Sequence, residues 1–148
     1  MAFGTRPQAA PQVLLADVET HQGLDPTGLP DLVISGVTLS TDRTRPGDLY
    51  AALPGIRAHG AAYVDKALAA GAVAVLTDEV GADLVGGSAP VLVVEHPRNV
   101  LGPLAAWLYD EPARRLRLIG VTGTQGKTTT TRLLEGALPN SGPPAAVI

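Results

Sequence analysis

Short segments rich in branched apolar residues recur along the first part of the chain and predict the strands of a sheet. They lie at residues 32–39, 49–53, 72–76 and 91–94. The last two are continuous apolar runs, which is typical of parallel strands that are covered on both faces. A glycine inside the first segment, Gly36, predicts a β-bulge there.

Apolar residues at helical spacing lie before and between these segments. Residues 13–18 predict a short helix, residues 61–70 a helix that Gly71 caps, and residues 100–109 a further helix. Pro103 fits the last of these only if it lies in the first turn. The alternation of strands and helices predicts an α/β domain with a mostly parallel sheet.

A polar loop joins the first two predicted strands. Residues 40–45 are rich in hydroxyl and charged groups, and Pro46-Gly47-Asp48 predicts a type II turn with glycine at the positive-φ position. Strands that lead into a polar loop and a tight turn are also how an α/β domain builds a ligand crevice. The pattern alone supports a solvated loop and a ligand-binding loop equally.

A second region begins at residues 116–121, a branched apolar run that predicts a strand buried on both faces. A glycine-rich turn follows, and a helix is expected to run to about Leu138, before Pro139. This order of strand, glycine-rich loop, Lys-Thr and helix turns backbone N–H groups toward a triphosphate. Val121 stands where the general phosphate-loop pattern has its first glycine, so a turn that binds nothing is the alternative.

Four residues of that loop have distinct expected roles. Gly123 and Gly126 lack a Cβ that would hold a phosphate away from the backbone. Lys127 would neutralise the β- and γ-phosphates, and the Thr128 hydroxyl would hold Mg²⁺. The sequence therefore predicts a site for a nucleoside triphosphate and Mg²⁺.

The best domain boundary lies at residues 110–113, which gives an N-terminal domain at 1–113 and a second region at 114–148. A parallel sheet built from strand–helix–strand units needs helices on both faces. One strand, one helix and the start of a further strand at 145–148 cannot supply them. We therefore expect the first β–phosphate-loop–α unit of a truncated nucleotide-binding domain, and an N-terminal fragment.

Composition argues against several kinds of partner. The net charge is −3 and aromatic residues make up 3% of the chain, so neither a basic patch nor a stacking platform for nucleic acid is expected. Cysteine is absent, and no apolar run approaches the roughly 18 residues of a membrane-spanning helix. We expect a soluble, cytoplasmic protein.

The histidines and one acidic pair have unremarkable expected roles. His21, His59 and His96 are far apart and lack the spacing of a metal site. We expect His59 to be solvated in a loop, with substrate contact as the alternative. Asp78 and Glu79 are adjacent and would point in different directions on a strand or a helix, so a solvated turn is expected there.

Two blocks of sequence carry a resemblance to a known family. The first is residues 46–55, Pro-Gly-Asp-Leu-Tyr-Ala-Ala-Leu-Pro-Gly, together with the residues that follow at 59–76. The second is residues 123–130, Gly-Thr-Gln-Gly-Lys-Thr-Thr-Thr. Together they resemble the Mur ligases, and within them the MurE group, over residues 33–138. Folylpolyglutamate synthases share the phosphate loop, so the first block is what distinguishes the MurE group from other proteins with this loop.

The resemblance implies that the first domain grips the uridine-diphosphate end of the substrate. Carried over by position, the substrate contacts are Leu39, Thr41, Ile56, Arg57 and Ala58. The implied ATP loop is Gly123, Thr124, Gln125, Gly126, Lys127, Thr128 and Thr129. Two positions depart from the family pattern. Ser40-Thr41-Asp42 stands where many members have Asp-Ser-Arg, and Gln125 stands where Asn is usual.

The implied activity is that of an ADP-forming acid–amino-acid ligase of peptidoglycan precursor synthesis. It adds diaminopimelate or lysine to UDP-N-acetylmuramoyl-L-alanyl-D-glutamate through an acyl phosphate, with Lys127 as catalytic residue and Thr128 on Mg²⁺. The amino-acid-selecting domain is expected beyond Ile148, so we expect this chain alone to be inactive, and monomeric. Which of the two amino acids is added is left open.

Two other classes of protein remain open. One is a non-catalytic module that binds a UDP-sugar. The other is a different phosphate-loop enzyme, such as a kinase or a relative of the folylpolyglutamate synthases. A kinase would leave the block at residues 46–55 without a role.

Overall fold

The computed structural model describes residues 10–24, 28 and 31–138. The chain divides into two compact units, Met1–Pro112 and Ala113–Ile148. The stop expected at Pro139 and the strand expected at 145–148 lie outside the described residues.

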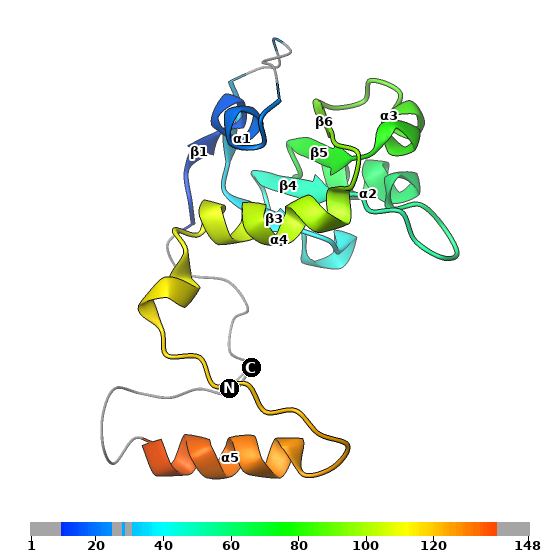
Figure 1. The fold of residues 1–148 in the computed structure, drawn as a ribbon. Coiled ribbons are helices and arrows are strands. Elements are labelled where there is room, and N and C mark those ends of the chain that lie inside the picture. Colours follow the sequence, from blue (N-terminus) through cyan, green and yellow to red (C-terminus); the bar gives the residue numbers. More distant parts are fainter. Residues whose placement is uncertain (1–9, 25–27, 29–30, 139–148) are drawn as a thin grey trace. The chain divides into compact units, whose positions relative to one another are not determined.

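A four-stranded parallel sheet forms the centre of the first unit (Figure 1). Its strands, in spatial order, are β3 (Gly36–Thr38), β4 (Asp48–Ala51), β5 (Ala74–Thr77) and β6 (Val91–Val93). Every residue of β4 and β5 is buried, because helices cover both faces of the sheet. The expected α/β fold with a mostly parallel sheet is confirmed.

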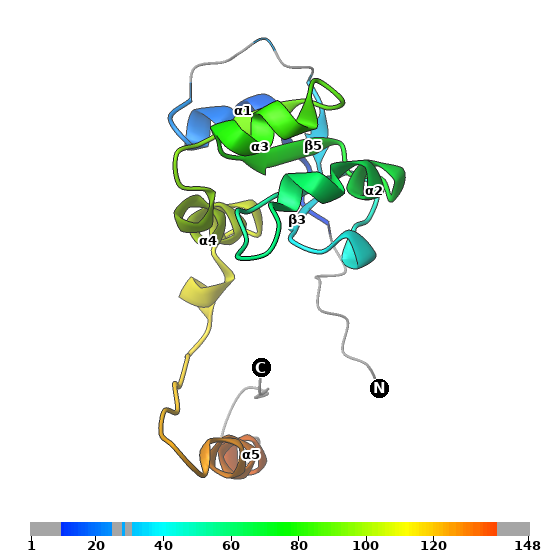
Figure 2. The same cartoon turned by 90° about the vertical axis from the view of Figure 1, so that its right-hand side faces the viewer.

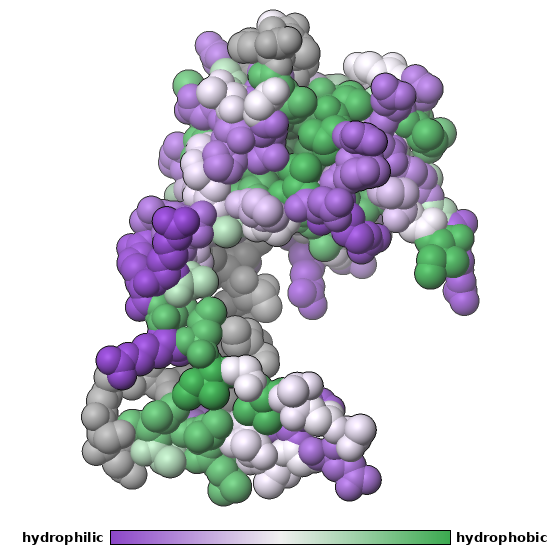
Figure 3. Space-filling model, viewed as in Figure 1, coloured by the Kyte–Doolittle hydropathy of each residue, from purple (hydrophilic) through white to green (hydrophobic). Residues whose placement is uncertain are grey.

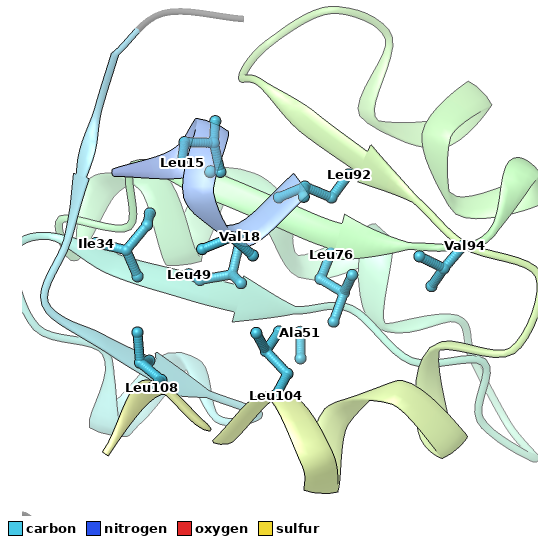
Figure 4. Close-up of a cluster of buried hydrophobic side chains, with 11 residues drawn as sticks. Leu15, Val18, Ile34, Leu49, Ala51, Leu76, Leu92, Val94, Leu104 and Leu108 are labelled. Carbon is cyan, nitrogen blue, oxygen red and sulfur yellow. The ribbon is translucent and has the colours of Figure 1, made fainter. Parts of the chain in front are cut away.

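The two faces of the sheet pack against different helices, as the alternation of side chains along a strand requires. On one face, α1 (Leu15–His21) and α4 (Pro97–Leu108) bury leucines against Leu49 and Leu76 (Figure 4). On the other face, a 3₁₀ turn, η2 (Gly60–Tyr63), and α2 (Val64–Ala69) and α3 (Glu79–Val85) pack on Tyr50 and Val75. Figure 2 shows α4 and α2 on opposite sides of the strands.

The single strand expected at 32–39 is wrong, because the chain changes sheets within it. Val33–Ile34 forms β2, which pairs antiparallel with β1 (Val13–Leu14), and β3 starts only at Gly36. Ser35 between them donates its backbone N–H to the Gly47 carbonyl at 2.8 Å and its hydroxyl to the Pro46 carbonyl at 3.0 Å. These bonds fix the interruption at Ser35 between β2 and β3. The bulge expected at Gly36 is not formed.

The turn that Ser35 contacts, at residues 45–48, forms as the sequence predicts. Gly47 has φ of +86°, and the Asp48 N–H donates to the Arg45 carbonyl at 3.1 Å across the turn. Asp48 is fully buried, and its carboxylate accepts the Arg45 N–H at 2.8 Å. The buried carboxylate therefore fixes the entry into β4.

The helix α4 begins at Pro97, earlier than expected, so Pro103 lies in its interior rather than in its first turn. An interior proline removes one backbone hydrogen bond and crowds the residue before it. Gly102 precedes it and has no Cβ to clash, and Pro103 faces solvent. Burial of Leu104 and Leu108 from the same helix stabilises α4 despite the lost bond.

The second unit contains a short 3₁₀ turn, η3 (Pro112–Arg115), which spans the division, and the helix α5 (Lys127–Ala137). The buried strand expected at 116–121 is wrong: no strand is assigned there, and Leu116, Leu118 and Ile119 are each at least 60% exposed. Strand geometry needs a neighbouring backbone to pair with, and none of the described residues supplies one. Apolar side chains consequently lie on the surface of this unit (Figure 3).

Within the described part of the chain, no helix is both long enough and apolar enough to span a bilayer.

Candidate substrate edge and phosphate loop

Two of the predicted contact segments leave the same edge of the parallel sheet. Leu39 and Thr41 follow β3, and Ile56, Arg57 and Ala58 follow β4. Strands β3 and β4 are parallel neighbours in register, with Val37 opposite Leu49, so their carboxyl ends meet at one edge. This edge is where α/β folds bind ligands.

The segment after β3 is a short 3₁₀ turn, η1 (Thr41–Arg43), with a fixed entrance. The buried Thr38 places its hydroxyl 3.2 Å from both the N–H and the carbonyl of Ser40, and the Thr44 hydroxyl donates to the same carbonyl at 3.0 Å. Leu39 remains 57% exposed. The loop is therefore ordered by its own hydroxyls while Leu39 faces solvent.

One ion pair ties this turn to the helix after β4. The Lys66 ammonium donates to the Asp42 carboxylate at 2.7 Å. That hydrogen bond, followed by the charge of Lys66, lowers the pKa of Asp42 below its ordinary value of 3.8. Both side chains are well exposed, so the pair contributes little stability.

Replacing this lysine, Lys66→Met, is expected to raise the pKa of Asp42 back toward its ordinary value. NMR titration of the Asp42 carboxyl group would measure it, with Lys66→Arg as the control that keeps the charge. A carboxyl with a lowered folded-state pKa contributes stability above its ordinary value, and the contribution is lost as pH falls through the lowered value. An unchanged Asp42 titration in Lys66→Met would show that the pair does not form.

The segment after β4 is a loop at residues 52–60 whose ends are tied down. The Ala52 N–H donates to the Leu76 carbonyl and the Gly60 N–H to the Leu53 carbonyl, both at 2.9 Å. The buried Thr77 hydroxyl donates to the Ala52 carbonyl at 2.8 Å. A Cβ on Gly60 would lie 2.8 Å from the Leu53 nitrogen, so only glycine allows this closure.

The tip of this loop is the exposed part. Ile56, Arg57 and Ala58 all face solvent, and Ile56 is fully exposed. An exposed isoleucine beside an arginine presents an apolar surface and a positive charge together. Such a tip suits a ligand that has both a ring and a phosphate.

Tyr50 supports the same loop from beneath. The residue is only 3% exposed, and its hydroxyl donates to the Gly60 carbonyl at 3.1 Å. Burial, with a smaller effect from Tyr63, raises the pKa of Tyr50 above its ordinary value of 10.0. The phenol is therefore held in its neutral, donating form.

Removing this hydroxyl, Tyr50→Phe, is expected to cost about 0.5–1.5 kcal/mol of stability near neutral pH. The raised folded-state pKa contributes fully below pH 10 and is lost as pH rises through the raised value, so wild type and variant should converge there. Urea unfolding of both proteins between pH 7 and about 11 measures the gap. A stability difference between wild type and Tyr50→Phe that stays constant over the whole pH range would contradict the role given to the Tyr50 hydroxyl.

The solvated positions expected for His59 and Asp78 are wrong. The side chains are only 13% and 21% exposed, and His59 Nε2 lies 3.0 Å from Asp78 Oδ1. Asp78 is the N-cap of α3 and accepts the Gly81 N–H at 2.8 Å. An aspartate between a strand and a helix is a typical N-cap. The position of Asp78 after the apolar run at 72–76 was therefore the sequence signal that its carboxylate is hydrogen-bonded.

An open hollow with a volume of about 530 Å³ lies at the carboxyl ends of β5 and β6. Its lining is acidic and apolar: Asp78, Glu79, Val80, Val93, Val94 and Glu95. Carboxylates repel a diphosphate. The charge therefore favours the loops after β3 and β4, rather than this hollow, for an anionic ligand.

The predicted phosphate loop lies within the second unit, where residues 122–130 are exposed. Gly123 and Gly126 have φ of +152° and +77°, which only glycine adopts readily. Gly126 is the N-cap of α5, and its carbonyl accepts the Thr130 N–H at 2.9 Å. The ammonium of Lys127 folds back and donates to the Gly123 carbonyl.

These features fit a bound phosphate in two respects. A Cβ on Gly126 would meet nothing within 4 Å, so the loop side of the helix N-terminus is open. The ammonium of Lys127, the first residue of this eleven-residue helix, and the first N–H groups of the helix both attract anions. Among the described residues no group of three or more His, Cys, Asp or Glu is placed to hold a metal ion, so Mg²⁺ on Thr128 stays a prediction.

Comparison with known proteins identifies a family. A profile described as "Mur ligase family, catalytic domain" matches residues 33–109. The chain is 55% identical over 109 residues to the UDP-N-acetylmuramoyl-L-alanyl-D-glutamate–2,6-diaminopimelate ligase of Streptomyces avermitilis, covering 73% of this chain and 22% of that protein. It is 44% identical over 116 residues to the Pseudomonas aeruginosa ligase of the same name, covering 78% and 24%.

Solved structures agree with this assignment. MurF ligase from Thermotoga maritima, in complex with ADP, matches with a TM-score of 0.53 and 31% identity, covering 72% of this chain and 23% of that one. MurF from Acinetobacter baumannii matches with a TM-score of 0.67, covering 91% and 29%, and at 23% identity it shows the fold alone.

The resemblance expected from the sequence is confirmed. The chain spans about a quarter of the length of the curated relatives it matches. The family profile covers more than half of the chain, from the antiparallel β2 to the end of α4. The chain therefore belongs to the Mur ligase family.

Proposed function

We propose that this chain supplies the N-terminal part of an ATP-dependent ligase that adds the third amino acid to UDP-N-acetylmuramoyl-L-alanyl-D-glutamate. One observation carries the proposal: the contact segments expected to grip the uridine diphosphate leave neighbouring parallel strands at one edge. The names of the relatives at 55% and 44% identity specify the same substrate and diaminopimelate as the added amino acid.

The first unit would hold the substrate by its nucleotide. The Thr41 hydroxyl and the exposed Arg57 suit the diphosphate, while Leu39, Ile56 and Ala58 offer apolar surface to the uridine. Binding at this end keeps the distant carboxylate of the dipeptide in place for reaction, which lowers the entropic part of the barrier.

The second unit would bind ATP through residues 123–129. The substrate carboxylate attacks the γ-phosphorus, the bond to the β-phosphate oxygen breaks, and ADP leaves. The amine of the amino acid then attacks the acyl phosphate, loses a proton and displaces inorganic phosphate. Lys127 would neutralise charge that builds on the phosphates, and Mg²⁺ held by Thr128 would add to that neutralisation.

The finer assignments belong to the same proposal. We place the reaction in the cytoplasm, on a monomer, with ATP and Mg²⁺ as cofactors, and with either diaminopimelate or lysine as the added amino acid. A net charge of −3 offers no electrostatic support for a nucleic-acid partner.

Calorimetry with the nucleotide-linked dipeptide and with ATP tests the proposal. The chain should bind the uridine compound more tightly than ATP, and Arg57→Ala should weaken that binding about tenfold, because it removes a charge-assisted hydrogen bond. Arg117→Ala removes the same charge from an exposed position in the other unit and should leave the affinity unchanged. Binding of ATP alone would favour a kinase and contradict the proposal.

The second candidate is a module that binds the UDP-sugar and does no chemistry. It is favoured by Val121 at the position of the missing glycine and by the absence of an assigned strand at 116–121. This module would bind the uridine compound and show no affinity for ATP in the same experiment.

A further inference from the structure

His59 is held at both nitrogens of its ring. The Ala61 N–H donates to Nδ1 at 3.0 Å, and Nε2 lies 3.0 Å from Asp78 Oδ1. A backbone N–H can only donate, so Nδ1 must accept, and the ring proton then sits on Nε2 and is donated to the carboxylate. The two contacts therefore fix both the tautomer and the orientation of the ring.

The carboxylate at the other end of this bridge is itself fixed. Asp78 directly follows β5, and its Oδ1 also accepts the Gly81 N–H as the N-cap of α3. A Cβ on Gly81 would lie 2.6 Å from Cε1 of His59, so the helix approaches the ring because that position is a glycine. The bridge thus joins the loop after β4 to the rigid start of α3.

The exposed tip at residues 54–58 stands directly before this bridge. Its own three contact residues face solvent, while the loop closes below them through the Gly60 N–H and the Tyr50 hydroxyl. A loop that must meet a ligand binds more tightly when its conformation is fixed beforehand, because less entropy is lost on binding. The ring of His59 links this tip to the start of α3, and the Arg98 guanidinium of α4 donates to the Pro54 carbonyl at 3.3 Å.

We propose that His59 is a positioning residue of the substrate site. Its bridge to Asp78 holds the tip at residues 54–58 in the conformation that receives the uridine-diphosphate end of the substrate. The inference rests on the proposed function and adds to it a residue that acts through the loop rather than on the substrate.

The test measures the affinity of the 148-residue chain for UDP-N-acetylmuramoyl-L-alanyl-D-glutamate by calorimetry. His59→Asn keeps an oxygen that can accept the Ala61 N–H but is too short to reach Asp78, so it breaks the bridge and retains the cap of η2. It should weaken binding about tenfold, and Asp78→Ala should do the same. The double variant His59→Asn/Asp78→Ala should lose no more affinity than either single variant, because both changes remove the same bridge.

Two variants serve as matched controls. Asp78→Asn retains an oxygen that can accept from both Gly81 and His59, and should bind within about threefold of wild type. His96→Ala removes an exposed histidine outside the loop and should bind as wild type does. Hydrogen exchange at the Gly60 amide, which donates to the Leu53 carbonyl, should quicken in His59→Asn while amides of β5 stay protected, which separates a loosened loop from general unfolding.

Each outcome decides between the two proposals. Wild-type affinity in His59→Asn, or additive losses in the double variant, overturns the positioning role and leaves the proposed function standing. Failure of the unaltered chain to bind the uridine compound overturns the proposed function, and the positioning role with it. If His59→Asn does not fold, Asp78→Asn and Asp78→Ala still test the bridge, and equal affinities for these two variants overturn it.

Discussion

Gly81→Ala is expected to destabilise the first unit by about 2 kcal/mol or more, although alanine is the better helix former. The new Cβ would lie 1.9 Å from Thr77 Oγ1 and 2.6 Å from His59 Cε1. The gain in helix propensity is about 1 kcal/mol. Overpacking typically costs about 1–3 kcal/mol and occasionally more, and a separation of 1.9 Å is well inside van der Waals contact.

Neither neighbour of Gly81 can move away cheaply. Thr77 is fully buried and its hydroxyl donates to the Ala52 carbonyl at 2.8 Å. His59 is held at both ring nitrogens. Relief of the clash must therefore break one of these bonds or shift α3 away from the sheet, and either change exposes Val85 or leaves a buried polar group unpaired.

Urea unfolding measures the effect. Val80→Ala, one position earlier in α3 and 63% exposed, is the control and should change stability by no more than about 0.5 kcal/mol. Thr77→Ala removes the nearer obstacle, so the double variant Gly81→Ala/Thr77→Ala should be more stable than the sum of the two single changes predicts. A stabilised Gly81→Ala would mean that α3 does not lie against β5 as described.

The central strands β4, β5 and β6 could be predicted because their signal is local. The continuous apolar runs at 72–76 and 91–94 became β5 and β6, and the Pro46-Gly47 turn appears with its positive φ. A strand buried on both faces has apolar residues at every position, whatever its neighbours are. The same criterion applied to 116–121 gave a wrong strand, because an apolar run forms a strand only where a partner is present.

The errors at Ser35 and at His59 have a different origin. Both residues are polar, and their structural roles come from hydrogen bonds to residues that are distant in sequence: Gly47 for the first and Asp78 for the second. Apolar periodicity carries no information about such bonds. The segments expected to contact the substrate were predicted through family resemblance, and both follow neighbouring parallel strands, so they leave the sheet at one edge.

Lys127→Ala is expected to reduce ATP-dependent product formation by at least about 10²-fold, the largest effect predicted for this chain. Lys127 is the first residue of α5, and its ammonium folds back and donates to the Gly123 carbonyl. Transfer of a phosphoryl group depends almost entirely on positioning and on neutralising charge that spreads over its oxygens. Removing the one ammonium of the loop leaves the backbone N–H groups to do this alone.

A suitable assay uses a chimera in which this chain replaces the matching N-terminal part of the Streptomyces avermitilis ligase. Arg132→Ala is the matched control: it lies on the same helix and removes the same charge, but that charge is already paired with Glu135 at 2.6 Å. This control should stay within about twofold of the parent, because an exposed ion pair contributes little. Lys127→Arg keeps the charge with a different shape and should not restore full activity.

Binding of the uridine compound separates a lost catalytic group from a damaged protein. Lys127 belongs to the second unit, whereas the substrate edge lies in the first. Lys127→Ala should therefore bind UDP-N-acetylmuramoyl-L-alanyl-D-glutamate with unchanged affinity while product formation falls. If more than about a third of the activity survives, the phosphates are not neutralised by this residue, and the loop after residue 122 would have to be assigned another role.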